Sequence, residues 1–272
     1  RSGTEPQRET FLRPTLRNDI LWCQLFSEPN AGSDLAGLQS SAVLDGDHFI
    51  LNGQKVWSSN AQLAQFGILM ARTDAELPKH KGITFFLLDM ALAGVEVRPI
   101  KQMTGESEFC EVFFSDVIVP SDAVLGEVNG GWAVAMAVLQ DERGGAGASG
   151  VISLRRRLEH MIQGAGEVSP LQIDGLIEIL NRGKALQSLM ERRGGDPHIA
   201  PIAKLMNSEL SYDEAQLDAS LHGAHSMLTS ASIQALLYSP GMRIAGGSSE
   251  IQRNIIGERL LGLPREPQIA SD

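Results

Sequence analysis

The feature that most constrains the fold is a change of periodicity near Pro120. Between residues 40 and 120, short apolar runs are separated by turn signals, and no helix of useful length fits between them. After Pro120, apolar residues recur at helical spacing. Strands followed by helices, without alternation, disfavour a parallel βαβ sheet. The pattern therefore predicts an α+β chain, in which an antiparallel sheet (a small barrel or a sandwich) precedes a helical bundle.

Turn residues delimit the expected strands. Asp45-Gly46-Asp47 predicts a hairpin, and Asn52-Gly53 predicts a second turn soon after it. The expected strands are 41–44, 48–51, 54–57, 66–70, 83–88 and 112–114.

The second half carries the helical pattern. The expected helices are 132–143, 154–163, 171–191, 202–222 and 250–261. Residues 144–148, Gly-Gly-Ala-Gly-Ala, follow the first of these and predict that it ends there, with room for a bulky group beside it.

Composition limits the partners of the chain. Its 272 residues include 23 basic and 33 acidic side chains, and the net charge of -10 disfavours binding to nucleic acid or to an anionic membrane.

Cys23 and Cys110 lie far apart and outside any C-x-x-C pattern, so neither a disulfide nor a zinc site is expected and a reducing cytoplasm suits them. No apolar run approaches the roughly 18 residues of a membrane span, and the polar start lacks the apolar core of a signal peptide.

Two polar segments of the first half could bind a ligand. Residues 27–34, Ser-Glu-Pro-Asn-Ala-Gly-Ser-Asp, offer backbone N–H groups and the hydroxyls of Ser27 and Ser33 to a cofactor, although an ordinary turn is the alternative. Trp57 ends a strand, where it suits either core packing or the wall of a planar ring. In the second case the Ser59 hydroxyl could bond a ring nitrogen.

A third segment lies near the C-terminus, at residues 246–253. Ser249 and Gln252 have capping-box spacing, which predicts that a helix begins here. Gly246 and Gly247 would let a ligand approach the backbone, and a helix N-terminus favours anionic groups. A capped surface helix is the alternative.

The helical half also contains a candidate acid. On a helix, Glu142 shares a face with Ala135, Val138 and Leu139, so the helix is apolar nearly all round and is expected to be buried. Burial raises the pKa of a carboxyl group and makes it a candidate proton acceptor, whereas an exposed helix end is the alternative.

Other catalytic patterns are not found in the sequence. His222 and His225 lack a third ligand nearby, so no metal site is expected. No Ser-His-Asp set, G-x-G-x-x-G fingerprint or phosphate-binding P-loop can be assigned.

Taken together, five segments resemble the signature motifs of the acyl-CoA dehydrogenases. They occur in the family's order and span nearly the whole chain. The segments are L-F-S-E-P-N-A-G-S-D (25–34), L-N-G-Q-K-V-W-S-S-N (51–60), F-F-S-D-V-I-V-P (113–120), L-G-E-V-N-G-G-W (125–132) and G-G-S-S-E-I-Q-R-N-I-I (246–256).

The resemblance implies an antiparallel β-barrel domain followed by a C-terminal four-helix bundle, holding FAD and forming a homotetramer or heterotetramer. The implied boundaries are 1–20 for the end of an N-terminal helical domain, 21–128 for the β-barrel and 129–272 for the bundle. The chain is thus expected to begin where the family's first domain is ending. The family's Arg-x-x-Phe contact to a neighbouring subunit's FAD is not recognisable around residues 154–160.

Five residues of the β-domain acquire roles from the resemblance. Phe26, Ser27 and Ser33 are expected to line the flavin and its pyrophosphate, and Ser33 is expected to contact substrate as well. Trp57 is expected to cover a flavin face and Ser59 to bond flavin N5.

In the C-terminal signature, Ser248 and Glu250 match positions that reach FAD. Gly246 stands where many members carry the catalytic Glu, and its backbone N–H is expected to bind the thioester oxygen of the substrate. Another branch, typified by isovaleryl- and long-chain acyl-CoA dehydrogenases, places its Glu on a helix just before an Arg. That pair matches Glu142 and Arg143, so Glu142 is the expected base, with Asp141 as the alternative. Arg143 is expected to contact the CoA portion or to brace the loop.

The implied reaction is α,β-dehydrogenation of an acyl-CoA thioester to trans-2-enoyl-CoA, as in fatty-acid β-oxidation. Glu142 would remove a proton while a hydride leaves to flavin N5, and electron-transfer flavoprotein would accept the electrons. Two alternatives stay open: a non-catalytic FAD-binding partner subunit of a hetero-oligomeric dehydrogenase, and an acyl-CoA oxidase.

Overall fold

A computed structural model of the chain describes residues 2–165, 167–191 and 199–265, with backbone only for 140–155 and 164. The chain divides into two compact units, residues 1–138 and 139–272. The first unit contains the strands and the second contains most of the helices, so the predicted α+β order is confirmed.

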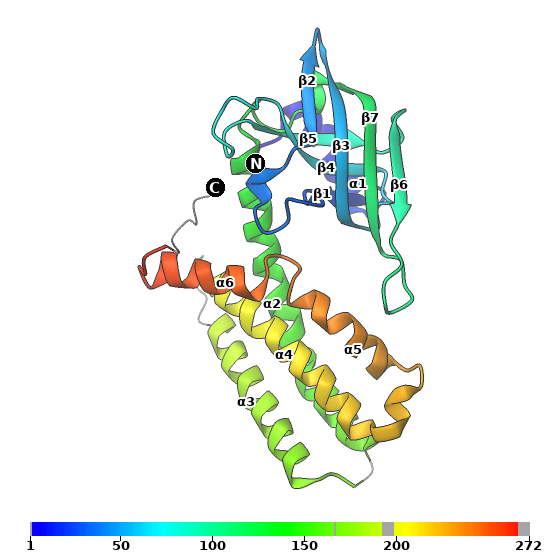
Figure 1. The fold of residues 1–272 in the computed structure, drawn as a ribbon, viewed down its shortest axis with the longest axis vertical. Coiled ribbons are helices and arrows are strands. Elements are labelled where there is room, and N and C mark those ends of the chain that lie inside the picture. Colours follow the sequence, from blue (N-terminus) through cyan, green and yellow to red (C-terminus); the bar gives the residue numbers. More distant parts are fainter. Residues whose placement is uncertain (1, 166, 192–198, 266–272) are drawn as a thin grey trace, which may run out of the picture. The chain divides into compact units, whose positions relative to one another are not determined.

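The first unit is built on one seven-stranded sheet (Figure 1). Its strands follow the order β1-β4-β2-β3-β7-β6, and β5 pairs with β4. Their bounds are β1 Trp22–Leu25, β2 Ser41–Asp45, β3 His48–Ser59, β4 Phe66–Arg72, β5 Ile83–Asp89, β6 Val95–Pro99 and β7 Phe109–Pro120.

The sheet is mixed, so the prediction of a wholly antiparallel sheet is wrong in one respect. Strand β1 runs parallel to β4, with Trp22 opposite Phe66, and β2 meets β4 in parallel through Ser41 and Arg72. Parallel neighbours need a long connection, and the β2–β3 hairpin lies within the one between β1 and β4. The other strand pairs are antiparallel.

The first predicted turn is confirmed and the second is wrong. Gly46 and Asp47 join β2 to β3, and Gly46 has a φ of 62°. Strand β3 continues through Asn52 and Gly53, where the register against β7 shifts. A side chain at Gly53 would lie 2.7 Å from the Ser40 Cα, so this glycine permits a close approach of two backbones and not a reversal of the chain.

The core of the first unit lies on the inner face of the sheet. Leu25, Leu51, Leu69 and Phe86 are fully buried within it. Burial of such apolar side chains is the main force that stabilises the unit.

The first residues form a helix that packs on this sheet. Helix α1, Glu5–Leu16, begins at the capping residue Thr4, and its Phe11 ring lies 5.3 Å from that of Trp22 and 5.0 Å from that of Phe66. The Gln7 side chain donates to main-chain carbonyls near the end of β7, those of Asp122 and Val124.

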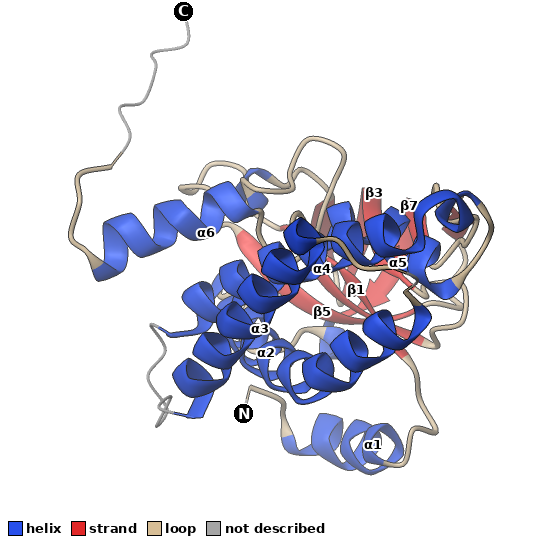
Figure 2. Cartoon of the chain, turned by 90° about the horizontal axis from the view of Figure 1, so that it is seen from below, coloured by secondary structure: helices blue, strands red, loops and turns tan. Residues whose placement is uncertain are grey.

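The second half of the chain is helical (Figure 2). Its first three helices extend beyond their predicted bounds, whereas the last one ends earlier than predicted. The helices are α2 Gly131–Gly164, α3 Pro170–Glu191, α4 Ile199–His222, α5 Ala231–Met242 and α6 Ser249–Ile255, with a final π turn at Ile256–Leu260. Short 3-10 turns lie at Leu35–Gly37, Ser121–Ala123 and Gly223–Met227.

Two expectations about these helices are wrong. Helix α2 continues through the glycine-rich residues 144–148, where a break was expected. Glycine lowers helix stability by only about 1 kcal/mol per residue, which the rest of a long helix can offset. Helix α5 was missed because Pro240 and Gly241, near its end, have the composition of a turn.

The second unit has its own apolar core, formed by α2, α3 and α4. Leu158 of α2, Leu186 of α3 and Ala203 of α4 are buried in it. Arg157 of α2 forms an ion pair with Glu214 of α4, with Nη2 2.8 Å from Oε2. This pair joins α2 to α4.

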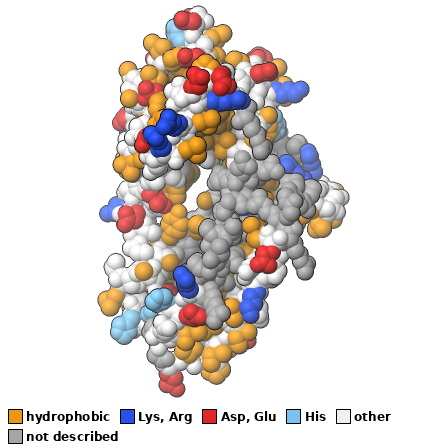
Figure 3. Space-filling model, turned by 180° about the vertical axis from the view of Figure 1, so that it is seen from behind, with side chains coloured by type: hydrophobic (Ala, Val, Ile, Leu, Met, Phe, Trp, Pro, Cys, Tyr) orange, Lys and Arg blue, Asp and Glu red, His pale blue; other side chains and the backbone are white. Residues whose placement is uncertain are grey.

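Charged side chains of both signs lie scattered among hydrophobic ones on the face drawn in Figure 3. Among the described residues, none of the helices combines the length and the apolar character that crossing a bilayer requires.

Candidate functional site

A buried ion pair organises the first candidate segment. Lys55 of β3 is fully buried, and its Nζ lies 2.7 Å from the Oε1 of Glu28, a residue only 8% exposed. The same Nζ donates to the main-chain carbonyl of Phe26 at 3.1 Å. The start of the loop after β1 is thereby attached to the middle of the sheet.

Further polar contacts extend this attachment. The Glu28 carboxylate accepts the backbone N–H of Gln39 at 2.6 Å and that of Ser40 at 2.9 Å. The Arg72 guanidinium, from β4, donates to the carbonyls of Ala36 at 2.7 Å and Leu38 at 3.3 Å. Residues 26–40 are thus held by Lys55 of β3 and Arg72 of β4, together with the loop's own Glu28, and we call this segment the anchored loop.

Burial and the opposite charge of the partner shift the pKa values of Lys55 and Glu28 in opposite directions. Burial lowers the pKa of Lys55 to about 8, although the Glu28 carboxylate beside it favours the charged form. Burial pushes the pKa of Glu28 upward, but the Lys55 ammonium and the hydrogen bonds from Gln39 and Ser40 together bring that pKa below its ordinary value. At neutral pH both groups are charged.

The end of β3 contains a β-bulge that exposes Trp57. Between Lys55 and Ser58 the register against β7 shifts by one residue, and Trp57 adopts a φ of 61°. For a bulky side chain this left-handed conformation is a genuine outlier of the kind found at functional sites. The Trp57 side chain is 59% exposed, and its ring meets the edge of the Phe109 ring at 6.0 Å.

The bulge also connects Trp57 to the anchored loop. The Val56 N–H donates to the Ser27 carbonyl at 2.9 Å, and Ser59 is exposed two residues further along the strand. The Ser58 hydroxyl is buried and has no hydrogen-bond partner among the described residues. Two segments that the sequence singled out separately, 27–34 and 57–60, are therefore adjacent in the fold.

The remaining predicted residues of the anchored loop differ in accessibility. Phe26 is buried with its ring 5.6 Å from that of Phe85, so only its main chain can reach a cofactor. Ser27 is partly exposed and Ser33 is exposed, so their hydroxyls are accessible. Next to Ser33, the exposed Asp34 forms an ion pair with Lys79 at 2.9 Å.

The C-terminal candidate is a glycine turn in the second unit. Gly246 and Gly247 have φ values of 65° and 95°, which glycine adopts readily. The Gln252 side-chain amide donates to the Gly246 carbonyl at 3.1 Å and to the Gly247 carbonyl at 3.3 Å. Lys204 of α4 donates to the Gly247 carbonyl at 2.6 Å.

The two glycines differ in the space around them. A Cβ at Gly247 would lie 2.6 Å from the Gln252 Nε2, whereas a Cβ at Gly246 would approach only the Lys204 Cε, at 4.0 Å. Among the described residues, the Gly246 N–H has no hydrogen-bond acceptor. This N–H is therefore available to an oxygen of a ligand.

Helix α6 begins one residue earlier than expected. The cap is Ser248, whose hydroxyl accepts the Ile251 N–H at 3.3 Å, and Ser249 is the first helical residue. Gln252 binds the glycine turn and does not complete a capping box. Glu250 is exposed, and its own backbone N–H, the Ser248 hydroxyl and the nearby Arg253 lower its pKa.

The expected acid lies where the structure describes backbone alone. Asp141, Glu142 and Arg143 belong to helix α2, but their side chains are outside the described part of the structure. The predicted roles of Glu142 and Arg143 stay predictions.

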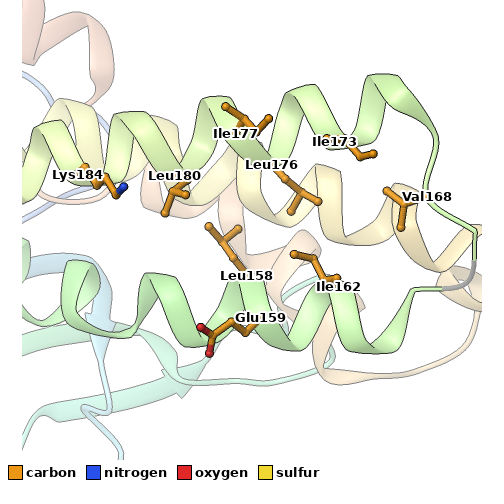
Figure 4. Close-up of a pocket in the computed structure, with 9 residues that line it drawn as sticks. All are labelled: Leu158, Glu159, Ile162, Val168, Ile173, Leu176, Ile177, Leu180 and Lys184. Atoms are coloured by element: carbon orange, nitrogen blue, oxygen red, sulfur yellow. The ribbon is translucent and has the colours of Figure 1, made fainter.

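The described residues also contain two buried thiols and an apolar groove, both outside these segments. Within the described ranges, no group of three or more His, Cys, Asp or Glu side chains could hold a metal ion. Cys23 and Cys110 are free buried thiols, and burial raises the pKa of Cys23 to about 12. A groove of about 570 Å³ between α2 and α3 is lined mainly by apolar side chains such as Leu158 and Leu176 (Figure 4).

Sequence reasoning missed the residues that hold these segments in place. Glu28 and Lys55 lie inside the quoted motifs but were not singled out, and Lys204 and Gln252 were given no such role. The available signal was a lysine within a strand rich in apolar residues, four residues before the exposed Ser59-Asn60 end. Its acidic partner is distant in sequence, so pairing could not be inferred.

Two family models match the chain. The model of the acyl-CoA dehydrogenase middle domain matches residues 23–117, and that of the acyl-CoA dehydrogenase C-terminal domain matches residues 183–261. Their order agrees with the order of the sheet unit and the helical unit.

Sequence similarity to individual proteins indicates the same family as the two family models. Acyl-CoA dehydrogenase IpdE1 of Mycobacterium tuberculosis is 38% identical over 283 residues, which cover 97% of this chain and 72% of IpdE1. Acyl-CoA dehydrogenase FadE34 of the same organism is 40% identical over 273 residues, 97% of this chain but only 38% of FadE34. The chain belongs to the acyl-CoA dehydrogenase family.

Solved structures support the fold. The steroid ACAD Tcur3481-Tcur3483 has a TM-score of 0.89 and 29% identity, with 97% of this chain and 73% of that chain covered. The ChsE4-ChsE5 complex from Mycobacterium tuberculosis has a TM-score of 0.85 and 28% identity, with 97% and 74% covered. The predicted α+β fold of the family is thereby confirmed.

Proposed function

We propose that the chain is the catalytic part of an FAD-dependent acyl-CoA dehydrogenase that converts an acyl-CoA thioester into a trans-2-enoyl-CoA. The observation that carries the proposal is the exposed Trp57, held in a left-handed conformation by a bulge beside the anchored loop. A strained and solvent-exposed indole contributes little to a core, so its cost in stability is explained by a ligand.

The donor groups on this chain fit a flavin. The Trp57 ring offers a flat apolar wall, and the exposed Ser59 offers a hydroxyl next to it. Ser27, Ser33 and the N–H groups of the anchored loop suit the polar edge and the pyrophosphate of FAD. Ser248 and Glu250, at the start of α6, are further expected contacts. When bound, FAD supplies the hydride acceptor at N5.

The remaining residues act on the thioester. Glu142 is proposed to take a proton from the carbon next to the thioester carbonyl, a role that needs a carboxyl group with a raised pKa. The free N–H of Gly246 is proposed to hold the carbonyl oxygen as negative charge develops on it. Removing such a donor typically costs on the order of 2.7–4 kcal/mol in the barrier. Arg143 is proposed to contact the CoA portion.

The test of the base is the variant Glu142→Gln. It should bind FAD as the wild type does but fail to bleach the flavin absorbance when acyl-CoA is added without oxygen. Asp141→Asn is the matched control, because Asp141 is the alternative base and lies one residue away. Bleaching at the wild-type rate by Glu142→Gln, or its loss in Asp141→Asn, would contradict the assignment.

A non-catalytic partner subunit is the second candidate, favoured by one observation. Gly246 provides no acid at the position where many family members carry their base. Among the structural neighbours, Tcur3481-Tcur3483 and ChsE4-ChsE5 each bear two subunit names. Purified chain that shows a flavin spectrum but never bleaches with any acyl-CoA would favour this role. Rapid peroxide production in air would instead indicate an oxidase.

The partners follow from the same reasoning. We propose electron-transfer flavoprotein as the acceptor, a homotetramer or heterotetramer as the assembly, and the cytoplasm as the compartment, which suits two free buried thiols.

A bulky branched or steroid acyl group is the first substrate class to test, because one structural neighbour is described as a steroid ACAD. A panel of straight, branched and steroid acyl-CoA thioesters, scored by flavin bleaching, distinguishes these substrates.

A further inference from the structure

The Lys55–Glu28 pair lies between two segments assigned to the cofactor. Lys55 is two residues before Trp57, and Glu28 directly follows Ser27. Three contacts join the segments. They are the 2.7 Å salt bridge between Lys55 and Glu28, the hydrogen bond from Lys55 to the Phe26 carbonyl, and the hydrogen bond from the Val56 N–H to the Ser27 carbonyl. These three contacts determine how the Ser27 end of the anchored loop lies relative to the bulge.

Stability alone does not account for this pair. Taking two charges out of water costs several kcal/mol each, and well-packed apolar side chains of similar volume are often as stable or more stable. Lys55 is fully buried and Glu28 is nearly so, so both costs apply here. A charged pair does provide directional bonds that an apolar pair lacks, here to the Phe26 carbonyl and to two loop N–H groups.

The anchored loop depends on these bonds for its shape. It has little regular structure beyond one short 3-10 turn. Some of its carbonyl groups accept hydrogen bonds from Lys55 and Arg72 of the sheet, and two of its N–H groups donate to Glu28, which Lys55 holds. A loop that is already ordered binds a ligand without a further loss of conformational entropy. The same exposed groups on a loose loop would bind more weakly.

We propose that Lys55 and Glu28 are positioning residues for FAD: their buried ion pair holds Ser27 and Trp57 in the arrangement that the cofactor requires. This inference rests on the proposed function. It concerns FAD affinity and flavin geometry, so it can fail while the proposed function stands.

Three variants separate positioning from a purely structural role. Lys55→Met leaves a buried carboxylate without its partner, and the variant could fail to fold for that reason. The double variant Lys55→Met/Glu28→Leu removes both charges and keeps the volume, so its fold is expected to survive. Lys79→Met is the matched control, because it breaks the exposed Lys79–Asp34 pair on the same loop.

The measurements are FAD affinity, the unfolding temperature of the apoprotein and the visible circular dichroism of the bound flavin. The double variant should unfold near the wild-type temperature as apoprotein yet bind FAD about tenfold or more weakly, as expected when a loop must be ordered on binding. The flavin dichroism should change, because the indole and the flavin no longer have a fixed orientation. Lys79→Met should match the wild type in all three measurements.

Three results would overturn the inference. A double variant with wild-type FAD affinity and wild-type dichroism would show that the pair does not position the cofactor. A loss of affinity matched by an equal loss in Lys79→Met would show a general effect of loop charge. Wild-type chain that binds no FAD at all would overturn the proposed function, and the inference with it.

Discussion

Two lysines each donate a hydrogen bond to a main-chain carbonyl of a candidate ligand-binding segment, but they do so in different surroundings. Lys55 holds the Phe26 carbonyl from a fully buried position and pairs with Glu28. Lys204 holds the Gly247 carbonyl from a partly exposed position on α4. The sheet unit thus uses a buried ion pair where the helical unit uses a lysine within reach of solvent.

The difference follows from the backbone that each lysine supports. The glycine turn owes much of its shape to Gly246 and Gly247, which adopt positive φ at little cost, and to the nearby Gln252. The anchored loop lacks such local determinants over most of its length, so its shape depends on distant side chains. We expect the loop to be more sensitive than the turn to loss of its lysine.

The largest expected effect is therefore that of Lys55→Met. Breaking a buried pair by removing one partner typically costs 3–5 kcal/mol, because the remaining charge is left uncompensated; we expect a loss of about 3 kcal/mol or more in the free energy of unfolding. Denaturant titration of the apoprotein measures it. A loss no larger than that of Lys204→Met would break the comparison.

The same variant should show a characteristic pH dependence. Loss of the Lys55 ammonium removes the strongest influence that lowers the pKa of Glu28. We therefore expect burial, which raises this pKa, to outweigh the remaining hydrogen bonds from Gln39 and Ser40. A carboxyl group whose folded pKa exceeds its unfolded value contributes stability at low pH that is lost as pH rises through the folded pKa. The deficit of the variant relative to the wild type should therefore be smaller at about pH 5 than at about pH 7.

The glycine turn itself gives an intermediate effect. Gly247→Ala places a Cβ 2.6 Å from the Gln252 Nε2 at a φ of 95°, and it should cost about 1–3 kcal/mol. Gly246→Ala is the matched control, since the nearest atom to its Cβ is 4.0 Å away. It should cost less, and equal unfolding free energies for the two variants would show that contact with Gln252 does not matter.

The smallest effect is expected for Lys204→Met. It removes a hydrogen bond from a lysine ammonium to the Gly247 carbonyl, and the loss should be about 1.5 kcal/mol, the low end for a charged donor, because the side chain is partly exposed. Thermal unfolding measures the change, with Lys184→Met on the exposed face of α3 as a control. A loss as large as that of Lys55→Met would mean that the turn depends on its lysine as strongly as the loop does.

The amount that the sequence could predict differs between elements. The hairpin at Gly46 was predictable because a two-residue turn between alternating runs depends on local residues alone. The prediction of a turn at Asn52-Gly53 failed because Gly53 is required by the close approach of Ser40, a residue of another segment. The predicted end of α2 at its glycine-rich residues was wrong for another reason. The low helix propensity of glycine is a weak guide within a long helix.

By itself, the sequence determined the α+β order, the family and the segments that carry the candidate site, because these depend on periodicity and on residues close together along the chain. Only the tertiary structure decided that Lys55 pairs with Glu28, that a bulge exposes Trp57, and that Lys204 and Gln252 shape the glycine turn. Such contacts join residues from different elements or depend on strand register. The Lys55–Glu28 pair depends in addition on burial, which exists only once the chain has folded.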